Sequence, residues 1–201
     1  MNTLITIQSL LDRFHSCTFF SALASLGLRL YLAPVFWVAG MNKVESFPDI
    51  VQWFGNPDWG LGLPFPTLMA SLATGAEVFG AVALLFGFAV RWATIPLMFT
   101  MIVAATTVHW HNGWQAVHDM MSPWANENAA GAIERLEKAK ELLQTNGNYE
   151  WLTEHGNFIV SNNGIEWAAT YFIMLLALFF LGGGRYLSAD YWIRRQFMPN
   201  S

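Results

Sequence analysis

The stretch ALASLGLRLYLAPVFWVAG, residues 22–40, decides the fold of this chain. It is apolar throughout and carries a single formal charge, that of Arg29. A helix rises 1.5 Å per residue, so a stretch of this length spans roughly the ~30 Å hydrocarbon core of a bilayer. Residues 22–40 are therefore predicted to form a transmembrane helix.

Three further stretches have a similar length and character: about 68–88, 92–110 and 165–181. Glu77 lies inside the second stretch and Glu166 lies at the start of the fourth. Together the four stretches predict an all-α fold, a four-helix transmembrane bundle. The length of 201 residues suits a single membrane domain covering residues 1–201.

The composition agrees with a chain that is solvated by lipid. Of its residues 54% are hydrophobic and 12% are charged, and its mean hydropathy is +0.35. Soluble domains usually carry about 25% charged residues. The net charge of -4 and the lack of a basic cluster argue against nucleic acid as a partner. The single cysteine, Cys17, excludes an intrachain disulfide and any zinc or iron–sulfur site built from cysteines.

The distribution of basic residues near the span ends predicts the topology. Only Lys43 lies near a span on one side, whereas the other side has five arginines: Arg13, Arg91, Arg185, Arg194 and Arg195. Positive residues favour the cytoplasmic side. We therefore expect a multi-pass protein of the cell inner membrane with both termini in the cytoplasm. The loops 41–67 and 111–164 would face outward.

Three segments outside the spans also have a predicted structure. Residues 2–16 are predicted to form a helix on the inner membrane surface, with a frayed terminus as the alternative. Residues 44–66 are too apolar for a free loop and are predicted to pack on the outer membrane surface or to dip into it. Residues 127–145 are predicted to form a soluble amphipathic helix that ends near Gly147.

Arg29 and Glu77 are the first candidate functional residues, because ionisable groups at membrane depth are costly. Their depths in the two helices allow a buried ion pair, which could serve function or simply clamp the helices together. Phe36, Gly40 and Lys43 share the helical face of Arg29. The small residues on this face favour close helix packing, and a slot for a flat ligand is the alternative.

A second candidate site lies at the predicted outer ends of the third and fourth spans. His109, His111 and Glu166 would gather there if these helices are neighbours, together with Lys43 or His118. Two imidazoles and a carboxylate could hold a copper or zinc ion or relay protons. The alternative is an ordinary set of interfacial polar residues. In either case Glu166 is expected to lie within side-chain reach of His109.

The first two spans resemble the DoxX family. The segment from Leu28 to Lys43 is similar to the first-helix signature of that family, through an Arg, a small residue, a Phe, a Gly and a final Lys. The family's second helix and turn are matched by six residues: Glu77, Gly80, Leu84, Leu85, Gly87 and Arg91. The resemblance covers residues 25–110, and the loop 111–164 is longer than the usual form of the family.

The resemblance implies a small four-helix inner-membrane protein. Some DoxX-like proteins are described as subunits of thiosulfate:quinone oxidoreductase, and others as partners of redox or detoxification enzymes. A branch with an extended outer loop, which this chain resembles, is encoded beside small metal-binding peptides and enzymes that concern copper. Carried over by position, the resemblance singles out four residues: Arg29, Lys43, Glu77 and Arg91.

Three functions follow as hypotheses. In the first, the chain is a redox-linked subunit, accessory to a quinone-linked oxidoreductase, that binds quinone between the first two helices. Arg29 and Glu77 would contact the quinone carbonyls or handle its protons, Phe36 would lie near the ring, and a partner protein would supply electrons.

In the second hypothesis the chain is a non-enzymatic membrane anchor for a periplasmic or copper-handling protein or peptide. That partner would dock on the outer loop, which carries seven acidic residues against three basic ones: Asp119, Glu127, Glu134, Glu137, Glu141, Glu150 and Glu154 against Arg135, Lys138 and Lys140. In the third, it exports a small solute or metal, and a homo-oligomer would supply the additional helices.

Overall fold

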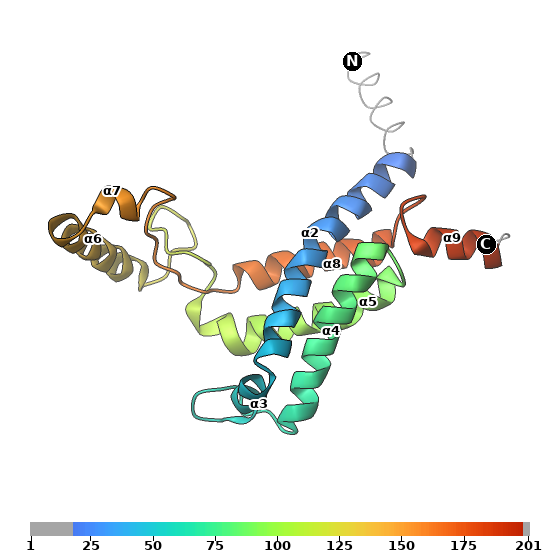
Figure 1. The fold of residues 1–201 in the computed structure, drawn as a ribbon, viewed down its shortest axis with the longest axis horizontal. Coiled ribbons are helices and arrows are strands. Elements are labelled where there is room, and N and C mark those ends of the chain that lie inside the picture. Colours follow the sequence, from blue (N-terminus) through green and yellow to red (C-terminus); the bar gives the residue numbers. More distant parts are fainter. Residues whose placement is uncertain (1–17, 199–201) are drawn as a thin grey trace, which may run out of the picture. The chain divides into compact units, whose positions relative to one another are not determined.

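The computed structural model describes residues 18–198, and this part of the chain is built from helices (Figure 1). Its only β-type pairing is an isolated bridge between Val117 and Ser161. The all-α prediction is therefore confirmed for the described residues. The predicted surface helix at residues 2–16 lies outside them.

The described chain forms two compact units, which we treat separately. Unit 1 contains the described residues up to Met101 and those from Tyr171 onward, and unit 2 is Ile102–Thr170. Unit 1 carries most of the apolar helices. Unit 2 carries the long loop that the sequence places between the third and fourth spans.

Within residues 18–198, three helices are long and apolar enough to cross a bilayer: Phe20–Glu45, Pro66–Phe86 and Val90–Asn112. The first corresponds to α2 (Thr18–Glu45), the second to α4 (Pro66–Phe86), and the third joins α5 (Val90–Val103) to the short helices η1 (Ala104–His109) and η2 (Trp110–Asn112). The fourth predicted span corresponds to α8 (Glu166–Leu181), whose 16 residues are fewer than in the other three. The existence of all four apolar helices is thus confirmed.

The helices follow local sequence signals at their ends. α4 begins at Pro66, whose ring suits the first turn of a helix, and ends at Gly87 with a φ of 66°. α2 runs through Pro34 without ending, and its last basic residue is Lys43. The third helix changes to a π-helical turn in η1, a feature that is rare outside functional or strained positions.

The segment between α2 and α4 contains a short helix and a tight loop. α3 (Phe47–Gly55) packs beside α4 and buries Phe54. The loop after α3 is held by Asn56, whose side-chain oxygen accepts hydrogen bonds from the backbone N–H groups of Asp58 and Trp59. The sequence predicts an apolar, packed segment here but not its helix. Its placement on a membrane surface stays a prediction.

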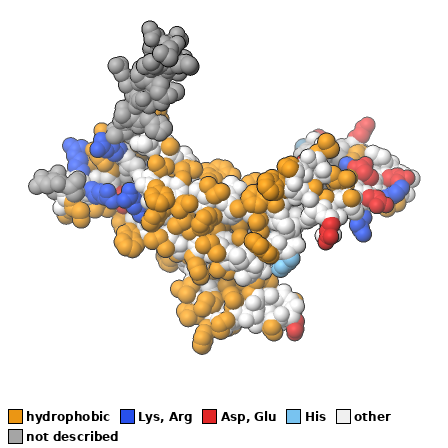
Figure 2. All heavy atoms as spheres, turned by 180° about the vertical axis from the view of Figure 1, so that it is seen from behind, with side chains coloured by type: hydrophobic (Ala, Val, Ile, Leu, Met, Phe, Trp, Pro, Cys, Tyr) orange, Lys and Arg blue, Asp and Glu red, His pale blue; other side chains and the backbone are white. Residues whose placement is uncertain are grey.

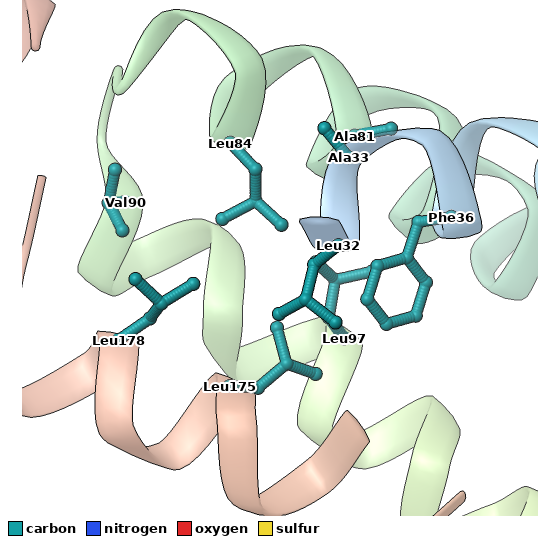
Figure 3. Packing of buried hydrophobic residues seen from close by; sticks show 9 residues of the cluster. All are labelled: Leu32, Ala33, Phe36, Ala81, Leu84, Val90, Leu97, Leu175 and Leu178. Carbon is teal, nitrogen blue, oxygen red and sulfur yellow. The ribbon is translucent and has the colours of Figure 1, made fainter. Parts of the chain in front are cut away.

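The core of unit 1 lies between α2, α4, α5 and α8 (Figure 3). Nine buried residues form it: Leu32, Ala33, Phe36, Ala81, Leu84, Val90, Leu97, Leu175 and Leu178. Most other apolar side chains of these helices are exposed, as the hydrophobic surface in Figure 2 shows. A soluble protein buries such residues, whereas lipid solvates them.

Unit 2 contains the predicted amphipathic helix. α6 (Ala129–Asn146) agrees with the predicted range 127–145, and Gly147 follows it directly. Lys138 pairs with Glu141 at 2.8 Å, rather than with Glu134 as its spacing of four residues suggests. The short helix α7 (Tyr149–Leu152) follows, and the backbone around Ala116 and Gln115 then hydrogen-bonds to residues 162–164.

The packing of α2 on α4 leads to a test of the fold. Gly40 faces α4 so closely that an added β-carbon would lie 2.7 Å from Val78 Cγ2, whereas the same atom at Gly27 would meet nothing within 4 Å. Gly40→Leu should therefore destabilise the protein by about 1–3 kcal/mol through overpacking. Gly27→Leu, on the same helix, should not. Thermal unfolding in detergent micelles measures both, and equal melting temperatures for the two variants would contradict the α2–α4 packing.

Candidate functional site

An enclosed ion pair joins Lys43 of α2 to Glu77 of α4. The Lys43 ammonium lies 2.7 Å from Glu77 Oε2 and 2.9 Å from Oε1. Glu77 keeps only 6% of its side chain exposed and Lys43 24%. The ammonium also lies 3.4 Å from the carbonyl oxygen of Ala39, a longer and weaker contact. The Glu77 carboxylate is thus almost fully buried, whereas the Lys43 ammonium is partly exposed.

The small residue one turn before Lys43 explains how the two charges meet. At Gly40 the backbone of α2 approaches Val78 and Glu77 of α4 within side-chain distance. Glycine permits this approach because it has no side chain. The Lys43 side chain, one turn further along α2, is then close enough for its ammonium to reach the Glu77 carboxylate.

The electrostatics of this pair follow from its apolar surroundings. A lone charge at membrane depth is costly, and partners of opposite sign offset that cost only when both are present. Both carboxylate oxygens accept hydrogen bonds from the ammonium. The pair has no net charge, because one positive group offsets one negative group. It can hold a proton, donate a hydrogen bond through the lysine, or accept one through the glutamate.

The predicted Arg29–Glu77 pair is wrong. Arg29 and Lys43 are 14 residues apart on α2, a separation of about 21 Å along a helix. The register of α2 against α4 sets Glu77 beside Gly40 and Lys43, and it sets Arg29 near Gly87 at the other end of α4. The sequence allowed either basic residue to reach Glu77, and only the packing at Gly40 decides between them.

Arg29 instead binds backbone carbonyls. Its guanidinium donates to the carbonyl of Leu84 at 3.2 Å and to that of Leu187 at 2.8 Å, and the residue is 1% exposed. Ser25, one turn earlier on α2, donates to the carbonyl of Gly182 at 2.6 Å. These bonds join α2 to the C-terminal end of α4 and to the segment after α8. The arrangement indicates a structural role for Arg29.

Arg91 and Phe36 also occupy structural positions. Arg91 donates to the carbonyl of Phe180 at 3.0 Å, near the end of α8. Phe36 is 1% exposed and meets the ring of Tyr171 edge-on, with centroids 6.3 Å apart. Of the five residues predicted to bind a cofactor, the structure brings only Lys43 and Glu77 together through their functional groups.

In unit 2, His109 and Glu166 of the predicted outer cluster each contact the backbone and not each other. His109 Nδ1 lies 2.8 Å from the carbonyl oxygen of Asn163, and Glu166 Oε2 accepts a 2.8 Å hydrogen bond from the backbone N–H of Ala116. No ion pair within 4.0 Å joins His109 to Glu166 among the described residues. The two segments do meet, but through the backbone of Asn163 rather than through the carboxylate.

No group of three or more His, Cys, Asp or Glu side chains that could hold a metal occurs within residues 18–198. The copper or zinc site at His109, His111 and Glu166 therefore stays a prediction.

Sequence reasoning missed Asp190, which starts the helix α9 (Ala189–Phe197). Its two carboxylate oxygens accept from the backbone N–H groups of Ala89 at 2.6 Å and Val90 at 3.0 Å. These groups belong to the start of α5, where N–H groups have no partner within the helix. The available signal was a lone acidic residue at the otherwise basic end of the molecule.

Comparison with known proteins places the ion pair inside a shared region. A family model described as DoxX matches residues 24–110. The chain is similar to "Inner membrane protein YphA" of Escherichia coli (strain K12), with 29% identity over 110 residues, 52% of this chain and 74% of YphA. It is also similar to "Putative oxidoreductase CatD" of Bacillus subtilis (strain 168), with 31% identity over 86 residues, 43% of this chain and 60% of CatD. No solved structure matches the chain significantly.

The energetic coupling of Lys43 and Glu77 can be measured directly. Lys43→Met should destabilise the protein by about 3–5 kcal/mol, because it leaves a buried carboxylate unpaired. Glu77→Met should cost a similar amount, and the double variant should cost less than either single change. Denaturant or thermal unfolding in micelles measures this cycle. The exposed pair Lys138–Glu141 provides the control, with a coupling of about 1 kcal/mol or less. Additive effects at Lys43 and Glu77 would contradict the pair.

Proposed function

Because the chain belongs to the DoxX family of integral membrane proteins through residues 24–110, we propose that it is the quinone-binding membrane subunit of an oxidoreductase system. The observation that carries this proposal is the enclosed Lys43–Glu77 pair with its partly open ammonium. The electrons come from a partner oxidoreductase, and the residues of this chain bind the quinone headgroup and handle its protons.

The proposed membrane placement is a four-span bundle in the inner membrane with both termini in the cytoplasm. Three apolar helices of 21–26 residues exceed the length needed to cross a bilayer. α8 has 16 residues, about 24 Å, and local thinning of the bilayer makes up the difference. The similarity to YphA, which is named as an inner membrane protein, supports this location.

The site supplies the groups that a quinone requires. A quinone accepts two electrons and two protons to become a quinol, and its carbonyl oxygens accept hydrogen bonds. The 3.4 Å contact from Lys43 to the Ala39 carbonyl is the weakest of the three made by the ammonium. A quinone carbonyl replaces it without breaking the ion pair. As the partner's electrons reduce the quinone, the Lys43 ammonium donates one proton to this carbonyl oxygen; the second proton of the quinol and the proton that restores the ammonium come from water.

The quinone approaches Lys43 from its open side and does not lie between α2 and α4. The seam between these helices is filled, because Val78 packs directly on Gly40. The flat-ligand slot expected within the seam is therefore not part of this proposal. CatD, named as an oxidoreductase, aligns with 86 residues of this chain, which supports a redox function for the shared region.

Quinone binding by the purified protein in lipid nanodiscs tests the proposal. A hydrogen bond to a charged group contributes about 1.5–3 kcal/mol, so Lys43→Gln should weaken binding of a short-chain ubiquinone or menaquinone about ten- to a hundredfold. Lys43→Arg keeps the ion pair but moves its donors, so it should stay folded and still bind less tightly. Lys138→Gln on α6 is the matched control and should bind like the wild type. Absence of saturable binding, or equal binding by the wild type and Lys43→Arg, would reject the site.

A second candidate function is supported by unit 2. Several large apolar side chains are exposed there, outside the apolar helices: Met121, Trp124, Leu142, Trp151 and Ile159. Together with the excess of acidic over basic residues in the loop 111–164, they favour docking of a partner protein or peptide at the outer face. The chain would then act as a membrane anchor for that partner, with or without a quinone.

Crosslinking in intact membranes tests the anchor function. One specific partner should be captured by the wild type and lost from the double variant Met121→Ser/Trp151→Ser, since both side chains are well exposed, at 91% and 68%. Glu137→Gln is the control, because it changes one exposed charge and leaves the apolar residues in place. Capture of the same proteins by all three forms would exclude this surface as the docking site.

A further inference from the structure

A cleft of about 1000 Å³ lies at the end of unit 1 that carries α9. The start of α5, the end of α8, the glycine-rich link 182–184 and α9 form its walls. Figure 2 shows a group of Lys and Arg side chains gathered over this end of unit 1. The cleft is separate from the Lys43–Glu77 pair, which none of its lining residues contacts.

The cleft is strongly cationic. Four arginines line it: Arg91, Arg185, Arg194 and Arg195. Its one carboxylate, that of Asp190, already accepts from the backbone N–H groups of Ala89 and Val90. Among the described residues no carboxylate lies within 4.0 Å of any of the four guanidinium groups. The positive charge of the cleft is therefore available to a ligand from outside the chain.

The same cleft has an apolar wall. Trp92 and Phe180 line it with 77% and 70% of their surface exposed. Next to the cleft on α9, the ring of Trp192 lies 5.6 Å from the guanidinium carbon of Arg195, which lines the cleft. Tryptophan and arginine at the end of a membrane helix are typical of the headgroup region. A small anion such as free phosphate would neutralise the arginines but would leave this apolar wall in contact with water.

We propose that this cleft is a binding site for an anionic phospholipid. Its phosphodiester group binds between Arg185 and Arg194, and its acyl chains lie on Trp92 and Phe180. Arginine suits this role because its planar group donates two parallel hydrogen bonds to a phosphate. The site is specific for the headgroup rather than for general negative charge, because the arginines line one cleft together with an apolar wall.

Lipid retention by the purified full-length protein tests this site. The protein is extracted from membranes containing equal amounts of phosphatidylglycerol and phosphatidylcholine, and bound lipid is counted by native mass spectrometry. Each basic residue near an anionic headgroup contributes about 1 kcal/mol, so Arg185→Gln/Arg194→Gln should reduce phosphatidylglycerol retention about thirtyfold. Neither side chain makes a hydrogen bond or ion pair within residues 18–198, so this variant should fold.

Arg135→Gln/Lys138→Gln is the matched control, because it removes the same charge from α6 in unit 2. It should retain phosphatidylglycerol like the wild type. Equal losses in both double variants would show attraction by net charge alone and would overturn the site, as would equal retention of the two lipids by the wild type. Inorganic phosphate is the third arm. If it displaces the bound lipid at low millimolar concentration, the cleft is a free-anion site and the lipid assignment is wrong.

Discussion

The cost of a charged side chain inside apolar surroundings is the constraint on which the rest of unit 1 depends. Glu77 is almost fully enclosed in the middle of α4, and only a partner of opposite charge makes that position tolerable. Lys43 is that partner, and it reaches Glu77 because Gly40 lets the two helices touch. The ion pair therefore fixes the register of α2 on α4. A slip of one turn would part the charges and place a side chain against Val78.

The same constraint acts on the other basic groups of unit 1 through the backbone. Helix ends leave carbonyl groups without partners, and in lipid each of these is costly. Arg29 binds carbonyls at the end of α4 and after α8, and Arg91 binds one near the end of α8. At the start of a helix the unpartnered groups are N–H donors, and the Asp190 carboxylate accepts hydrogen bonds from those at the start of α5. Ionised side chains thus complete the hydrogen bonding at the ends of apolar helices.

The apolar helices were predictable from sequence because their signal is local. Long uncharged runs such as residues 22–40 need no knowledge of their neighbours, and α6 follows from its own periodicity. The partner of Glu77 could not be predicted from local sequence. It depends on which turn of α2 meets which turn of α4, and that register is set by the contact of Gly40 with Val78. Asp190 was missed for a related reason, since its partners lie about 100 residues away.

The balance of positive and negative side chains in unit 1 differs between the two ends of α2. The two ends therefore suit ligands of different charge. At the Lys43–Glu77 pair the two charges match, so the pair is neutral overall and a charged ligand would disturb it. Near α9 the guanidinium groups outnumber the carboxylates, so a neutral ligand would leave them unmatched. A neutral, apolar ring with hydrogen-bonding carbonyls therefore suits the first site, and an anionic amphiphile suits the second. Because about 21 Å of helix separates Arg29 from Lys43, the field of one site is weak at the other, and the two can bind independently.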